Sequence, residues 1–258
     1  MPSDAQRAKA LRAAAGPGDS YWRLSRAPRY SVLFALPLLL LYEALAAFLA
    51  VTAGEGVRNG ADVMLKSAFI AVAGTRGPLI FAACLVGLGI WIVARDLKRG
   101  RGRLRLAVFG TMLVESAALA LVFGFVVGGI TSRLIAPLAT MAIAQVSEMG
   151  VATRLMVSLG AGLYEELLFR VVLVSALLLL TRRVLNWPWA VAGTVSVVAG
   201  ALIFSAFHYI GPYGDPLRLD SFVFRAVGGL AFSALYVTRG FGITAWTHAL
   251  YDVFLLVV

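Results

Sequence analysis

The chain has 258 residues, of which 60% are hydrophobic and only 14% are charged, and its mean hydropathy is +0.88. Soluble domains carry roughly 25% charged residues, so a soluble fold of this length could not bury so much apolar surface, whereas a bilayer can accept it. The net charge of +10 comes from basic residues that cluster beside apolar runs, as at 95–105. This is the pattern of cytoplasmic loops. The composition therefore predicts a multi-pass integral membrane protein that has the lipid bilayer, and no nucleic acid, as a partner.

The chain begins with a polar, basic arm at residues 1–29, which is followed by apolar runs long enough to cross a bilayer. The first run is longer than the apolar part of a signal peptide, so we expect it to remain as a span. The predicted spans are about 30–51, 78–94, 106–130, one within 151–180, 188–208, 221–238 and 243–258. We expect a loop with room for a short surface helix at 52–77 and an interfacial segment at 131–150. These runs predict an all-α transmembrane bundle of about seven spans, forming one helical domain at 30–258.

Lysine and arginine are distributed unevenly between the predicted loops. If the N-terminus lies inside, the inner segments hold most of the basic residues, whereas the outer loops mix both signs. The inner segments are then 1–29, 95–105, 181–187 and 239–242. The positive-inside rule therefore predicts that the N-terminus is inside and the C-terminus outside. The composition, rich in Ala, Arg and Val, is typical of bacterial proteins, and we expect the chain in a bacterial cytoplasmic membrane.

Ionisable residues within the predicted spans are candidates for function, because a charge at the bilayer centre costs about 2.5–3.5 kcal/mol. Glu166 and Arg170 stand at i and i+4 on one helix and can pair. Glu165 is turned by about 100° from Glu166 and can face a different neighbour. A structural alternative is that both glutamates only brace helices through Arg170. Glu43 and Glu115 also lie in apolar runs, where we expect them to pair with helix-end arginines or with each other.

The chain contains only two histidines, and both lie in or at the edge of apolar runs. His208 follows Phe204 at i+4, and His248 precedes Asp252 by the same spacing. A single histidine at a helix end is more often an interfacial residue than a catalytic one. Two histidines in a chain with intramembrane carboxylates favour a functional interpretation, in which Asp252 fixes the tautomer of His248.

Three motifs occur in order on successive apolar helices: Glu-Glu-x-x-x-Arg at 165–170, Phe-x-x-x-His at 204–208 and His-x-x-x-Asp at 248–252. The ordered set resembles the CPBP family, the CAAX prenyl protease and bacteriocin-processing proteins, also called the ABI family of intramembrane proteases. The resemblance covers roughly residues 150–258 and implies a CAAX-protease-like core in the C-terminal half. It also implies an endopeptidase that acts on a membrane-anchored protein or peptide, near the C-terminus of that substrate.

The resemblance assigns catalytic roles to four residues. Glu165 would be the general base, and His208 would help it hold and activate a water molecule. His248, with Asp252, would polarise the scissile carbonyl group and stabilise the oxyanion. The prenyl-protease branch has asparagine where this chain has Asp252, and an ionised aspartate cannot donate a hydrogen bond to an oxyanion. Asp252 would therefore be protonated or would act only by orienting His248.

The resemblance also assigns supporting roles. Glu166 and Arg170 would form a supporting pair, and Phe204 belongs to the second motif. We favour a reaction without metal or other cofactor. Zinc is the alternative, because Glu165, His208 and His248 could supply three ligands and leave a fourth position open.

Other function classes leave different signatures. The chain has no Gly-x-Ser-x-Gly motif for a serine nucleophile, and the order of its Tyr-Asp and Gly-Asp pieces is reversed relative to aspartyl intramembrane proteases. A non-catalytic immunity or scaffold protein of the same family, or a small transporter, stays open. A protease requires Glu165 and both histidines around one water molecule. A transporter requires a continuous polar path and usually an internal repeat.

Overall fold

The computed structural model describes residues 20–52, 57–99, 104–134, 149–211 and 214–256, and all regular structure within these ranges is helical. The all-α polytopic fold is therefore confirmed. Residues 1–19 of the predicted arm and most of the predicted interfacial segment 131–150 lie outside the described residues. The elements are α2 (Tyr21–Ser25), α3 (Pro28–Thr52), α4 (Gly60–Ala73), η1 (Gly74–Arg76), α5 (Gly77–Arg99), α6 (Leu106–Leu134), α8 (Val151–Gly160), η2 (Ala161–Val174), α9 (Ser175–Leu179), η3 (Leu180–Val184), α10 (Trp189–Phe207), α11 (Leu219–Arg239) and α12 (Phe241–Leu256).

Among the described residues, five helical stretches are long and apolar enough to cross a membrane. They are Pro28–Thr52, Gly60–Arg99, Leu106–Thr131, Trp189–Phe207 and Leu219–Arg239. The two other predicted spans are helical as well. One is divided where the α-helical segments α8 and α9 alternate with the π-helical segments η2 and η3. The other, α12, has 16 residues, fewer than the roughly 20 that usually cross the hydrocarbon core.

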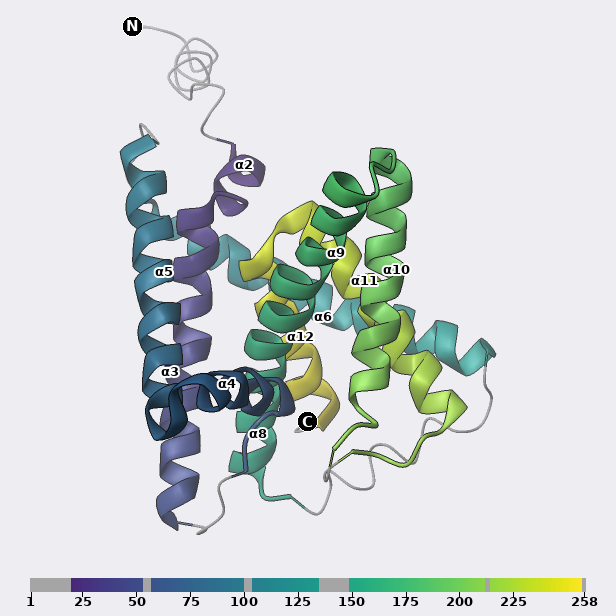
Figure 1. The fold of residues 1–258 in the computed structure, drawn as a ribbon, viewed down its shortest axis with the longest axis horizontal. Helices are drawn as coiled ribbons and strands as arrows, with labels where there is room; N and C mark the ends of the chain where they lie inside the picture. Colours follow the sequence, from purple (N-terminus) through teal and green to yellow (C-terminus); the bar gives the residue numbers. More distant parts are fainter. Residues whose placement is uncertain (1–19, 53–56, 100–103, 135–148, 212–213, 257–258) are drawn as a thin grey trace, which may run out of the picture.

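The segment expected to be a loop with a short surface helix contains α4, a helix of 14 residues. Asn59 caps its first turn, because its side-chain oxygen accepts a hydrogen bond from the N–H of Ala61 at 2.9 Å. The helix ends at Gly74, whose φ of 59° suits glycine. Figure 1 shows α4 lying across α3 and α5 near one end of the bundle. The reversal at Gly74 thus folds α4 back against the bundle, where it contacts η2.

Helix α12 packs against α3, α6, α8 and η2, and so lies at the centre of the bundle. A glycine permits its closest approach to η2. A Cβ atom on Gly162 would lie 2.6 Å from the Cβ of Ala249 and would also overlap the carbonyl oxygen of Ala245. Because Ala249 follows His248 in α12, this contact determines how close His248 comes to the glutamates of η2.

Candidate active site

Glu166 lies between Arg170 of its own helix and His248 of α12. Its Oε1 is 3.1 Å from Nη1 of Arg170, as the i, i+4 spacing predicted, and 2.7 Å from Nδ1 of His248. The Glu166 side chain is fully buried and that of Arg170 nearly so. The Arg170 guanidinium also lies over the rings of Phe204 and Phe232, at 4.5 and 5.7 Å from their centroids. Glu166 therefore joins η2 to α12 through a charged contact, in addition to its pairing within the helix.

The imidazole ring of His248 contacts Phe232 on one face and Glu166 at Nδ1. Phe232 of α11 stacks on the imidazole, with ring centroids 4.2 Å apart and planes inclined by 19°. Asp252, which we expected to orient the ring, has its Oδ2 3.7 Å from Nε2 of His248, which is too long for a hydrogen bond. The shorter contact is the one with Glu166. Sequence reasoning missed both contacts, since no local spacing links Glu166 to His248, 82 positions later, or Phe232 of α11 to α12.

His208 follows the last residue of α10 and caps its C-terminal end. Its Nδ1 lies 2.9 Å from the carbonyl oxygen of Phe204, and its ring meets the edge of the Phe204 ring with centroids 4.9 Å apart. Phe204 thus fixes the histidine through both its backbone and its side chain. Because Nδ1 is hydrogen-bonded to the backbone of Phe204, Nε2 is the ring nitrogen that remains available to a water molecule or a substrate.

Glu165 is buried, with 8% of its surface exposed, and it lies within electrostatic range of His208, His248 and Arg170. Its Oε1 accepts a hydrogen bond of 2.9 Å from Nδ2 of Asn59. The first glutamate of η2, His208 at the end of α10 and His248 of α12 therefore lie in one region of the bundle. The sequence-based boundaries had placed the two histidines near opposite faces of the membrane. In the structure His248 is the eighth of the sixteen residues of α12 and so lies near the middle of that helix.

Asn59 is the polar neighbour that sequence reasoning missed. It lies in the N-terminal half of the chain, in the segment expected to be a loop. The available signal was local, because asparagine ahead of an apolar run is typical of a helix N-cap. That signal predicts the start of α4, but not its contact with a glutamate 106 residues later in the chain.

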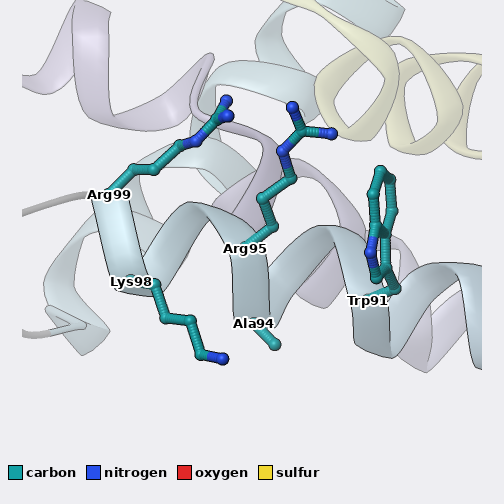
Figure 2. A pocket seen from close by; sticks show the side chains of 5 residues that line it. All are labelled: Trp91, Ala94, Arg95, Lys98 and Arg99. Carbon is teal, nitrogen blue, oxygen red and sulfur yellow. The ribbon is translucent and has the colours of Figure 1, made fainter.

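A hollow on the surface of α5 lies away from these residues (Figure 2). It is lined by Trp91, Ala94, Arg95, Lys98 and Arg99. The Arg95 guanidinium lies 4.9 Å from the centroid of the Trp91 ring. Basic residues beside a tryptophan at a helix end are typical of the membrane–water interface on the inner side. The hollow contains none of the predicted catalytic or supporting residues.

The intramembrane carboxylates without a motif are paired. Glu43 lies 3.1 Å from Arg58 and 3.0 Å from Lys66, and Glu115 lies 2.6 Å from Arg239. The arginine partners agree with expectation.

Within the described ranges, no three side chains of His, Cys, Asp or Glu are grouped as ligands of one metal ion, and Glu165, His208 and His248 do not form such a group.

Residues 147–254 match the family model described as type II CAAX prenyl endopeptidase Rce1-like. The matched segment contains all three motifs. No curated protein and no solved structure matches the chain. The family is one of membrane peptidases, in agreement with the apolar helices and with the order of the motifs. Residues 147–254, which carry the three motifs, are thus similar to the Rce1-like type II CAAX prenyl endopeptidases.

Proposed function

We propose that the protein is an endopeptidase that hydrolyses a peptide bond near the C-terminus of a membrane-anchored protein or peptide. The observation that supports this most strongly is the shared environment of Glu165, His208 and His248, which come from three separate helical segments. A structural role for the glutamates explains the Glu166–Arg170 pair. It does not explain why a second buried carboxylate, that of Glu165, lies within electrostatic range of both histidines of the chain.

In the proposed reaction, Glu165 is the general base. Its carboxylate takes a proton from a water molecule that His208 helps to hold, and the water oxygen attacks the carbonyl carbon of the substrate. The proton then passes to the leaving nitrogen as the carbon–nitrogen bond breaks. Proton transfer by a positioned side chain contributes about 10²–10⁴-fold to the rate.

His248 is proposed to stabilise the oxyanion. Its Nδ1 faces Glu166 at 2.7 Å, so a proton on this nitrogen is donated to the carboxylate. A second proton on Nε2 then makes the ring an imidazolium, which the buried Glu166 carboxylate stabilises. Nε2–H can donate to the oxyanion, and one such donor contributes roughly 10²–10³-fold. Asp252, whose Oδ2 lies 3.7 Å from Nε2, is proposed to assist Glu166, which holds the ring through Nδ1.

The test is cleavage by the full-length protein in proteoliposomes. The probe is a prenylated peptide ending in a CAAX sequence, analysed by mass spectrometry. We expect Glu165→Gln and His248→Ala to abolish cleavage while the purified proteins keep a cooperative thermal unfolding transition in detergent. Glu43→Gln is the control, because it makes the same chemical change in an intramembrane carboxylate outside the motifs, and its partners Arg58 and Lys66 both keep Asp62. Folded Glu165→Gln protein that still cleaves would contradict the catalytic assignment.

The metal-free reaction has its own test. We expect 1,10-phenanthroline to leave cleavage unchanged and no stoichiometric zinc to be found in the purified protein by elemental analysis. Loss of cleavage that added Zn²⁺ restores would favour the alternative in which Glu165, His208 and His248 bind the ion.

A further inference from the structure

Asn59 lies outside the segment that matches the family model, yet its side chain contacts the proposed general base. Its Nδ2 donates to Oε1 of Glu165 at 2.9 Å, and only 4% of Asn59 and 8% of Glu165 are exposed. A hydrogen bond donated to a carboxylate is stronger than one between neutral groups, especially where water is excluded. This hydrogen bond therefore stabilises the ionised form of the Glu165 carboxylate and fixes its orientation.

The start of α4 decides which end of the Asn59 amide faces Glu165. The backbone N–H of Ala61 can only donate, so the side-chain atom that it contacts at 2.9 Å must be the oxygen. The amide nitrogen is then the atom directed at Glu165. The backbone N–H of Asn59 donates to the hydroxyl of Tyr42 at 3.1 Å. Both the backbone and the side chain of Asn59 are thus fixed before a substrate binds.

Buried charges hold this arrangement in place. The Tyr42 hydroxyl donates to Asp62 at 2.9 Å, and Asp62 is paired with Arg58 at 3.0 Å and with Lys66 at 2.7 Å. Asp62 is fully buried, so the tyrosine and the two cations together satisfy its charge.

A glycine lets Asn59 come close to the helix that carries Glu165. A Cβ atom on Gly160, at the end of α8, would lie 2.7 Å from the Cβ of Asn59 and 2.6 Å from Cε2 of Tyr42. Any other residue at position 160 would therefore push α4 and α3 away from η2. The absence of a side chain there allows the hydrogen bond to form.

We propose that Asn59 is a positioning residue for Glu165. It holds Oε1 and directs the second carboxylate oxygen, Oε2, to the attacking water. The inference rests on the proposed function, and it adds α4 to the elements that build the site. Helix α4 acts as a rigid support, because the same side chain that caps the helix orients the base.

Serine at position 59 separates capping from positioning. It is a good N-cap, so Asn59→Ser keeps the start of α4 but removes the amide donor. We expect kcat for the prenylated CAAX peptide to fall on the order of 10- to 100-fold, as for the loss of a hydrogen bond to a charged group. The KM and the thermal unfolding midpoint should stay close to those of the unsubstituted protein. The acidic limb of the pH–rate profile should move to higher pH, because the carboxylate loses a donor that stabilises its ionised form.

The other charged groups near Glu165 do not change in this variant. They are His208, His248, Arg170, Asp252 and the neighbouring Glu166, which contacts Arg170 and His248. A shift of the pH profile therefore reports the lost donor, and a merely structural role for Asn59 would not produce it.

Aspartate at position 59 provides a second test, in case the serine variant folds poorly. Asn59→Asp also caps a helix and has nearly the size of asparagine, but it places an acceptor where Glu165 needs a donor. We expect its kcat to be lower than that of Asn59→Ser. If Glu165→Gln is inactive while Asn59→Ser or Asn59→Asp keeps the kcat and pH profile of the unsubstituted protein, the positioning role is wrong and the proposed function stands. If Glu165→Gln is itself active, the proposed function fails first.

Discussion

At the scale of single residues, the site depends on the Glu166 carboxylate, which binds two partners. Glu166 contacts Arg170 of its own helix and His248 of α12, and all three side chains are buried. Removing one member of such a group leaves an uncompensated charge where water cannot reach it. Glu166 thus contributes to stability and also determines the orientation of His248.

Replacement of Glu166 should therefore damage the fold as well as the reaction. We expect Glu166→Gln to destabilise the protein by about 3–5 kcal/mol, because Arg170 keeps its charge and loses its counterion. The measurement is the thermal or denaturant unfolding midpoint in detergent, beside Glu165→Gln, which removes no ion-paired carboxylate. Equal stability of the two variants would show that Arg170 is neutralised in another way.

We expect a substitution of Asp252 to reduce activity less than a substitution of the other catalytic residues. Its carboxylate is 3.7 Å from His248, whereas Glu166 is at 2.7 Å and already orients the ring. Asparagine keeps the shape and one acceptor oxygen, so Asp252→Asn should cleave the CAAX peptide within about tenfold of the unsubstituted rate, below the 10²–10⁴-fold expected for a lost acid–base group. A loss as large as that of His248→Ala would instead give Asp252 a direct part in the reaction.

At the scale of helices, close packing between η2 and α12 sets the geometry of the site. Gly162 and Ala249 meet at a distance that leaves no room for a further carbon atom. Overpacking a buried contact typically costs about 1–3 kcal/mol and shifts the backbone. In this structure such a shift would separate Glu166 from His248.

We therefore expect Gly162→Ala to reduce both stability and cleavage. Gly110→Ala is the matched control, because nothing lies within 4 Å of a Cβ atom at that position of α6. The control should be neutral or slightly stabilising, as alanine is favoured over glycine inside a helix. Measuring kcat and the unfolding midpoint for both variants tests this, and equal effects would mean that α12 can move without loss of function.

The helices themselves were largely predictable, since a run of apolar residues must lie in a helix to satisfy its backbone in lipid. The pair of Glu166 with Arg170 followed from i, i+4 spacing in the same way. Contacts between helices were not predictable. Asn59 and Phe232 reach Glu165 and His248 only because α4 folds back and α11 packs beside α12, and a single sequence carries no signal for such distant contacts.

At the scale of the whole molecule, the motif-bearing half depends on the helices before it. Helix α12 packs against α3 and α6 as well as against η2. The Arg239 side chain at the end of α11 pairs with Glu115 of α6 and donates to Ser25 of α2 at 2.9 Å. The N-terminal helices thus form one wall of the bundle and supply Asn59, so we expect them to be required for activity.

The arrangement of the helix ends gives a test of orientation. Figure 1 places α2, the C-terminal end of α5 and the turn between η3 and α10 at one end of the bundle, and the start of α8 and the C-terminal end of α10 at the other. The first end carries the basic residues of 95–99 and Arg182 and Arg183. The positive-inside rule therefore predicts that this end faces the cytoplasm.

Cysteine labelling can decide this orientation. In a Cys84→Ser background, which removes the single native thiol, a membrane-impermeant maleimide should label Leu217→Cys in intact cells. Lys98→Cys should react only after the membrane is permeabilised, because it lies in the basic segment at the opposite end. Both side chains are exposed in the structure, so burial does not explain a difference between them. The background protein alone should stay unlabelled. The reverse pattern would place the N-terminus outside and would mean that the basic end of α5 faces away from the cytoplasm.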